Sequence, residues 1–229
     1  MTFGLNAIAR RAGAVETADA GQISVQPPGN PDGKGANGLL ADWHRSSPAG
    51  VAAKPRRQLL AEFFTSVLVL SASFKYRPVP GGPNYLYWID GEWSLSLIAP
   101  DQWSAERRAG FVGVCVLQRD MTWTIEPSGW LGDRGPLANA VGKFFDAFTE
   151  MLDTNLTLEE ILPYHAGRLP YFPRLYANAL SRSLRTAVNL GDQAATRCRQ
   201  WSTELPRMES ELLARALPAG ASCGRSPGP

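Results

Sequence analysis

The sequence is poor in the residues that most often carry metal, disulfide or nucleophile chemistry. Its 229 residues include only three cysteines and two histidines. Cys115, Cys198 and Cys223 are odd in number and far apart, which argues against a disulfide framework. His44 and His165 lack the spacing of zinc ligands on a helix, so we expect no metal site and no cofactor. The chain also lacks a GKS or GKT phosphate loop, a nucleophile elbow, an HExxH pattern and a CxxC pattern.

Long hydrophobic runs are missing as well. No stretch reaches 18 consecutive apolar residues, the length that a transmembrane helix needs, and no apolar signal core stands near the N-terminus. We therefore expect a soluble, cytoplasmic protein without membrane insertion. The formal net charge is only +2, so the overall charge gives no reason to expect a nucleic acid partner.

Composition predicts one folded domain with a tail at each end. Residues 1–52 are rich in Gly, Ala, Pro, Asn and Asp, which is typical of a flexible tail. Residues 53–217 have the apolar content of a single domain, and residues 218–229 form a second tail. The segment LLADWH at 39–44 is apolar within its polar surroundings, and it is expected to dock onto the domain or onto a partner.

The clearest strand signals surround Asp90-Gly91. This dipeptide between two apolar runs predicts a hairpin with a two-residue type I′ turn, because both central residues of that turn need positive φ. Side chains alternate along a strand, so one face becomes a core face made of Leu86, Trp88, Trp93, Leu95 and Leu97. The opposite face then carries Tyr85, Tyr87, Glu92, Ser94 and Ser96.

A second hairpin is predicted from residues 111–118 and 121–125. A two-residue connection through Arg119 and Asp120 would place on the core face Val112, Val114, Val116, Met121, Trp123 and Ile125. Thr122 and Thr124 would then lie opposite. Arg119-Asp120 is a poor type I′ sequence, so a longer loop remains an alternative. Gly113 within the strand predicts a bulge or a close backbone approach.

Helices are predicted on both sides of these hairpins. Residues 55–73 are apolar almost all round, so they should form a buried helix against the sheet. Within a helical part at 133–217, Pro136 begins one helix, Thr157 opens another with a capping box, and Gly191 ends a helix that starts near Pro173. The predicted fold class is α+β: a four-stranded antiparallel meander packed by helices, with disordered termini.

Residues 80–126 form a β module that contains, in this order, Pro80-Gly81, Tyr85-Leu86-Tyr87, Gly91, Ser96-Leu97-Ile98-Ala99-Pro100, Trp103, Phe111, Gly113, Leu117, Asp120 and Thr122-Trp123-Thr124. This order and spacing over residues 80–125 resembles the family catalogued as domain of unknown function 2452. The resemblance implies a shared fold for the module and supplies no activity.

The hypothesis we favour is a non-catalytic module that binds an unknown protein or peptide partner. The candidate binding residues mix aromatic rings with hydroxyls, which suits a peptide, a sugar or an unstacked base. They are Tyr85, Tyr87, Ser94, Ser96, Thr122 and Thr124. Whether the C-terminal helices cover these residues is left open.

Two further hypotheses belong to other classes. The first is a small hydrolase-like enzyme that uses hydroxyls or carboxylates of the β module, the carboxylates being those of Asp90, Asp101 and Asp120. The second is an RNA-associated protein that contacts phosphates through Arg182, Arg185, Arg197 and Arg199. The competing interpretation of these arginines is a solvated surface with acidic partners elsewhere in the fold, and we do not expect nucleic acid binding.

Overall fold

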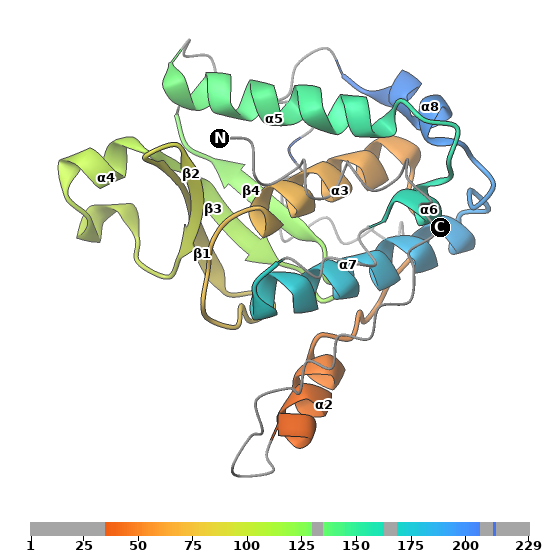
Figure 1. Ribbon diagram of the computed structural model, residues 1–229, viewed down its shortest axis with the longest axis horizontal. Helices are drawn as coiled ribbons and strands as arrows, with labels where there is room; N and C mark the ends of the chain where they lie inside the picture. The colour runs from red at the N-terminus through yellow and green to blue at the C-terminus, as the bar shows by residue number, and fades with distance from the viewer. Residues whose placement is uncertain (1–34, 130–134, 163–168, 207–212, 214–229) are drawn as a thin grey trace, which may run out of the picture.

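The structure, a computed structural model, describes residues 35–129, 135–162, 169–206 and 213. A four-stranded antiparallel sheet packs against helices (Figure 1), which confirms the predicted α+β class. The strands are β1 (Pro83–Ile89), β2 (Glu92–Ser96), β3 (Phe111–Leu117) and β4 (Trp123–Pro127). The longer helices are α2 (Gly35–Arg45), α3 (Arg56–Leu70), α5 (Pro136–Leu152) and α7 (Tyr171–Leu190). The shorter ones are η1 (Pro100–Gln102), α4 (Ala105–Ala109), α6 (Leu158–Ile161), α8 (Cys198–Trp201) and η2 (Ser202–Glu204).

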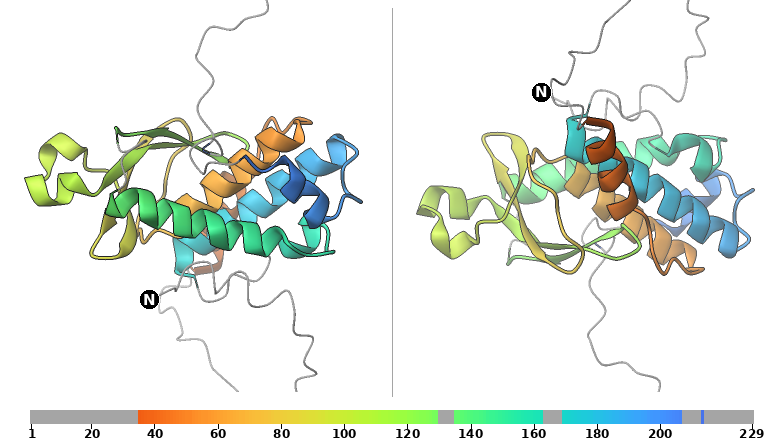
Figure 2. Two further views of the ribbon diagram at one scale, coloured as in Figure 1. Left: turned by 90° about the horizontal axis from the view of Figure 1, so that it is seen from above. Right: turned by 90° about the horizontal axis from the view of Figure 1, so that it is seen from below.

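The order of the strands differs from that of a simple meander. In the sheet the order is β2-β1-β3-β4, so β1 lies between β2 and β3. Because β2 and β3 both run antiparallel to β1, the chain must return along the full length of β1 before β3 begins. Residues 97–110 make this crossover and include η1 and α4, and α4 projects at one end of the molecule (Figures 1 and 2). Parallel strands need a connection of about this length.

The first hairpin has the predicted register. Trp88 pairs with Trp93 across a turn in which Asp90 and Gly91 both have positive φ, 51° and 81°. The two indole rings lie 4.6 Å apart between centroids. The predicted core face is wrong only at Leu97, which is 61% exposed. The reason is that β2 ends at Ser96, so the following residues leave the sheet.

The second hairpin has the longer loop. β3 and β4 pair Leu117 with Trp123 and Cys115 with Ile125, so the two-residue connection through Arg119 and Asp120 is wrong. Met121 adopts a left-handed conformation, φ 66°, which adds a third loop residue. Consequently Cys115 and Leu117 share the core face with Trp123 and Ile125. The prediction had placed Val114 and Val116 there, and those two side chains lie on the opposite face, half-buried.

Gly113 marks the predicted irregularity in β3. The register between β1 and β3 shifts at Leu86 and Tyr87, next to this glycine. A Cβ atom built on Gly113 would lie 2.5 Å from the carbonyl oxygen of Glu126 and 3.0 Å from Cα of Pro127. Only a residue without a side chain therefore lets β4 approach this closely.

Replacing Gly113 with Ala is expected to lower the free energy of unfolding by about 1–3 kcal/mol, the usual cost of overpacking. Urea denaturation of the variant and the parent would measure the difference. Gly142→Ala is the matched control, because a Cβ atom there meets nothing within 4 Å and Ala favours the interior of α5. An unchanged Gly113→Ala protein would show that β4 can move away from β3 without cost.

Helix α3 is the centre of the core, as the sequence predicts. It crosses the middle of the molecule with α5 on one side and α7 on the other (Figure 1), and every residue from Leu59 to Leu70 except Ala61 is buried. Phe63 and Phe64 meet Phe148 of α5 edge to face, at centroid distances of 5.3 and 5.2 Å. The sheet contacts both helices: Trp93 of β2 lies 6.4 Å from Phe144 of α5 between ring centroids, and the amide of Trp123 in β4 donates to Ser66 of α3.

The segment that contains α3 also covers both edges of the sheet. Just after α3, the Ser73 backbone donates to the carbonyl oxygen of Trp93 at 2.9 Å and accepts from the amide of Leu95 at 3.1 Å, on the outer edge of β2. At the other edge, Ser66 Oγ in α3 accepts from the amide of Trp123 at 2.9 Å. β4 ends with Pro127, which has no amide N–H to offer.

The C-terminal half follows the predicted start and stop signals. Gly135 precedes Pro136 at the start of α5, and Thr157 forms the predicted capping box of α6 with Glu160. Gly191 ends α7. After α7 the described residues form α8 and η2, and most of residues 204–217 of the predicted helical part lies outside the described residues. None of the helices in the described part is both long enough and apolar enough to cross a membrane.

The predicted tails fall largely outside the described residues. Residues 1–34 and 214–229 are not described, so the boundaries of the tails remain predictions. Within the predicted N-terminal tail, however, residues 35–45 form α2. Asp42 of α2 contacts Arg77 and Tyr171, so this helix lies against the domain.

Candidate functional site

The sheet has a face that turns away from α3, which we call the outer face. Strand register places five of the six predicted binding residues there: Tyr85 pairs with Ser96, Tyr87 pairs with Ser94, and Thr124 pairs with Val116. Thr122 precedes β4 and lies in the loop with Asp120. The observed register therefore supports a shared face for these residues, with the exception of Thr122.

Burial divides these six residues into two groups. Tyr87, Thr122 and Thr124 are 1%, 2% and 9% exposed, and their hydroxyls bond within the protein. Tyr87 Oη donates to the carbonyl oxygen of Ile98, Thr122 Oγ1 donates to Asp120, and Thr124 Oγ1 accepts from Gln118. In this structure these three side chains hold the fold together. The other group is half-buried and consists of Tyr85, Ser94 and Ser96.

An aromatic row runs along this face and ends in a cation. Phe111 lies 6.3 Å from Tyr85 and 5.5 Å from Tyr87 between ring centroids, and Trp103 meets Tyr87 edge-on at 6.3 Å. The guanidinium of Arg107 stands 4.5 Å above the indole of Trp103. Burial raises the pKa of Tyr87, so its hydroxyl stays protonated. Tyr87 is contacted by Ile98 and Trp103 of the crossover between β2 and β3 and by Phe111 of β3.

Two large apolar side chains stand exposed beside this row. Leu97 and Ile98 directly follow β2 and are 61% and 40% exposed. Their backbone is held in place, because the amide of Ile98 donates to Ser96 Oγ at 3.0 Å and its carbonyl accepts from Tyr87 at 2.9 Å. We call Leu97, Ile98, Tyr85, Ser94 and Ser96 the rim surface. It presents two exposed apolar side chains together with hydroxyls.

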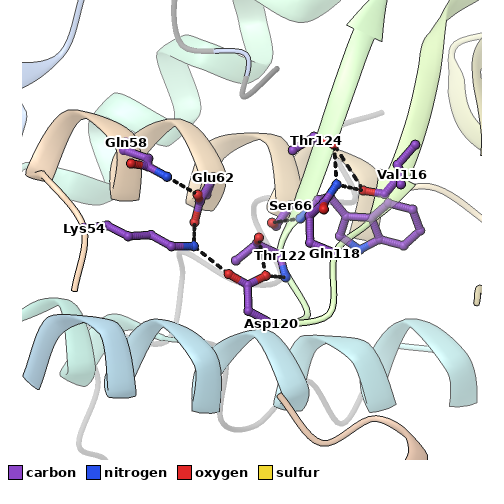
Figure 3. Close-up of polar contacts among 10 residues, drawn as sticks. Lys54, Gln58, Glu62, Ser66, Val116, Gln118, Asp120, Thr122 and Thr124 are labelled. Atoms are coloured by element: carbon purple, nitrogen blue, oxygen red, sulfur yellow. Dashed lines mark hydrogen bonds and ion pairs between the residues drawn. The ribbon is translucent and has the colours of Figure 1, made fainter. Parts of the chain in front are cut away.

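A buried charge cluster lies where α3 meets the β3–β4 loop (Figure 3). Lys54 Nζ lies 2.6 Å from Glu62 Oε2 and 2.5 Å from Asp120 Oδ2, and all three side chains are at most 12% exposed. Gln58 Nε2 donates to the other Glu62 oxygen at 2.9 Å, and Thr122 donates to Asp120 Oδ1 through both its amide and its hydroxyl. Each carboxylate oxygen therefore has a donor.

The charges of this cluster shift the pKa values of its members. Burial alone would lower the pKa of Lys54, but Asp120 and Glu62 outweigh it and raise that pKa. Burial would raise the pKa of Asp120, but the hydrogen bonds and charge of Lys54, together with Thr122, lower it. Both groups are thus held in their charged forms. A lysine held charged in this way is a poor base or nucleophile, so the cluster is suited to joining segments.

The three carboxylates considered for an enzyme are not gathered in one place. Asp90 lies in the β1–β2 turn and Asp120 in the β3–β4 loop, and the antiparallel register puts these turns at opposite ends of the sheet. Asp101 lies exposed in η1, within the crossover. General acid–base chemistry by a carboxylate pair needs both groups within reach of one substrate.

The four arginines of the RNA hypothesis all have partners within the chain. Arg185 lies 3.0 Å from Glu159, Arg199 lies 3.0 Å from Asp153, and Arg197 lies 3.8 Å from Glu160. Arg182 stands over the ring of Trp43 and donates to the carbonyl oxygen of Ser46. Acidic residues distant in sequence thus balance three of these charges.

The remaining residues of the family resemblance have structural roles. Gly91 provides positive φ, Pro100 begins η1, and Gly113 allows close packing. Trp103 packs on Tyr87, and Trp123 is fully buried. Each of these residues is therefore explained by the fold of the module.

The cysteines and acidic groups do not form a metal centre in the part of the chain that the structure describes. Cys115 and Cys198 are buried free thiols, and burial raises the pKa of both, that of Cys198 to about 12. Among the described residues no three His, Cys, Asp or Glu side chains come together as a metal site requires.

No family model, curated protein or solved structure matches this chain. The resemblance to domain of unknown function 2452 therefore remains a prediction.

Proposed function

We propose that the protein is a non-catalytic interaction module that binds a protein or peptide partner through the rim surface. The observation that carries the proposal is the exposure of Leu97 and Ile98 on a backbone that hydrogen bonds hold in place. Apolar side chains fixed in the binding geometry favour association, because little ordering entropy is lost when a partner covers them. The resemblance of residues 80–125 to an uncharacterised family and a cytoplasmic location are further parts of this proposal.

The chemistry around Leu97 and Ile98 suits a peptide. Tyr85 is half-buried, so part of its ring can contact a partner, and Ser94 and Ser96 offer hydroxyls on the same face. Interfaces commonly combine a few apolar anchors with a polar surround. The scattered carboxylates and the paired arginines support ranking this function above the hydrolase and RNA hypotheses.

A photo-crosslinking amino acid in place of Leu97 is expected to capture a discrete partner in an extract of cells that make the protein. The same amino acid in place of Leu190 is the matched control, since that residue is 57% exposed and lies at the end of α7. Excess unlabelled protein should suppress the adduct, whereas excess Ile98→Asp protein should not. Equal, diffuse labelling at both positions would contradict the proposal.

A further inference from the structure

Helix α2 is held to the domain mainly by polar contacts. Asp42 Oδ1 lies 2.8 Å from Arg77 Nη1, and Asp42 Oδ2 accepts from Tyr171 Oη at 2.9 Å. The ring of Trp43 stacks on the guanidinium of Arg182 at 4.2 Å. Figures 1 and 2 show α2 beside the first half of α7. We call Arg77, Tyr171 and Arg182 the docking surface.

The apolar side chains described in α2 contribute little to this contact. Leu40 is 55% exposed and Trp43 is 40% exposed, and none of the described side chains of α2 is buried. Ion pairs and cation–π contacts at exposed sites add little individually. The contacts described for α2 are therefore of kinds that each stabilise little.

The docking surface carries two guanidinium groups, and α2 provides a carboxylate partner for only one of them. Arg182 is half-buried, its Nε has no hydrogen-bond partner in the described part of the chain, and no carboxylate there pairs with it. Arg77 has Asp42 as its carboxylate partner. Without α2, Arg77 and the hydroxyl of Tyr171 would lose their carboxylate partner, and Arg182 would lose the ring of Trp43 while keeping its bond to Ser46.

We propose that the docking surface binds, in trans, a helical segment of a partner protein in which a carboxylate residue precedes an aromatic residue, and that α2 is a tethered competitor for it. The partner's chemistry follows from the contacts of α2: a carboxylate for Arg77 and Tyr171, and an aromatic face for Arg182. This surface shares no residue with the rim surface, so either proposal can fail without the other.

The tether makes α2 a strong competitor despite its weak contacts. Ser46, directly after α2, is 2% exposed and accepts from Arg182, and the amide of Ala49 donates to the carbonyl oxygen of Arg119. The chain therefore stays anchored when α2 leaves. A short tether gives α2 an effective concentration on the order of millimolar at the docking surface. A free segment displaces α2 only if its concentration is higher than this or if it binds more tightly.

The test uses a fluorescein-labelled peptide of residues 35–47 and the full chain. The unchanged protein should bind the peptide weakly. The full chain with Asp42→Asn and Trp43→Ala should bind it at least about tenfold more tightly, because the tethered competitor is disabled. Adding Arg77→Ala and Arg182→Ala to that variant should abolish the gain, whereas adding Arg185→Ala, a change elsewhere on α7, should not. A peptide with the same two α2 substitutions should not bind.

Several results would overturn the proposal. One is the absence of any gain in the Asp42→Asn, Trp43→Ala chain, and another is binding that survives loss of both docking arginines. A second measurement avoids substitutions altogether: excess unlabelled peptide should speed hydrogen exchange in residues 38–45 of the unchanged protein, and unchanged exchange would count against displacement. Concentration-dependent dimers that disappear in the Arg182→Ala chain would make the occupant a second copy and overturn the partner assignment.

Discussion

Replacing Trp123 with Ala is expected to lower the free energy of unfolding by about 3–5 kcal/mol, the usual cost of removing a large aromatic side chain from a core. Trp123 is 0% exposed, and its amide is bonded to Ser66 of α3. Truncation would leave a cavity between the sheet and α3 that the closely packed core can fill only in part. Chemical denaturation of the variant and the parent measures the loss.

Two control variants separate the lost volume from other effects at this position. Trp123→Phe keeps an aromatic ring and removes an indole N–H that has no hydrogen-bond partner in the described part of the chain, so its loss should be clearly smaller. Trp43→Ala removes an indole that is 40% exposed and should change stability by about 1 kcal/mol or less. A loss below about 1 kcal/mol for Trp123→Ala would contradict the core position.

Replacing Lys54 with Met is expected to cost about 3–5 kcal/mol near neutral pH, because removing one member of a buried ion pair leaves the partner charge uncompensated. Here two carboxylates, those of Glu62 and Asp120, would remain together at most 12% exposed. Adding Glu62→Gln and Asp120→Asn to Lys54→Met should recover much of the loss, since no buried charge then remains. A Lys54→Met protein as stable as the parent would show that the carboxylates reach solvent.

The same cluster predicts how stability depends on pH. The lowered pKa of Asp120 means that its contribution is present above the ordinary Asp pKa, about 3.9, and is lost as the pH falls through the lowered value. The raised pKa of Lys54 means that its contribution is present below the ordinary Lys pKa, about 10.4, and is lost as the pH rises through the raised value. The stability of the parent relative to the triple variant should therefore be highest between these limits and should fall outside them.

Features set by neighbouring residues were predictable from the sequence. Asp90-Gly91 determines the first turn and its register, Thr157 forms its capping box, and Gly191 ends α7. In each case the residue type favours one backbone conformation or supplies a local hydrogen bond. The apolar face of residues 55–73 likewise identifies α3, because a helix buried on several sides needs such a composition.

Features that depend on distant residues were not predictable from the sequence. Met121 takes a left-handed conformation that its residue type does not favour, and Asp120 bonds to Thr122 and Lys54 to fix that loop. The strand order depends on the path of residues 97–110 over β1, which no local pattern specifies.

The candidate sites show the same limit. The alternation of side chains along the strand predicted that Tyr85 and Tyr87 share a face. Their different burial could not be predicted, because it depends on contacts with Trp103 and Phe111. The contact between Trp43 and Arg182 joins residues far apart in the sequence. The apolar segment LLADWH at 39–44 within a polar tail predicted docking but could not identify Arg182 as the contact.

The position of Ser66 and Ser73 has a consequence for misfolding. Both belong to one short stretch of chain, yet one caps β4 and the other caps β2. If α3 separates from the sheet, backbone groups on both outer strands become unpaired together, and unpaired strand edges are templates for adding strands of other molecules. A partly unfolded molecule could then polymerise in two directions at once, so the packing of α3 protects against fibre growth as well as against unfolding.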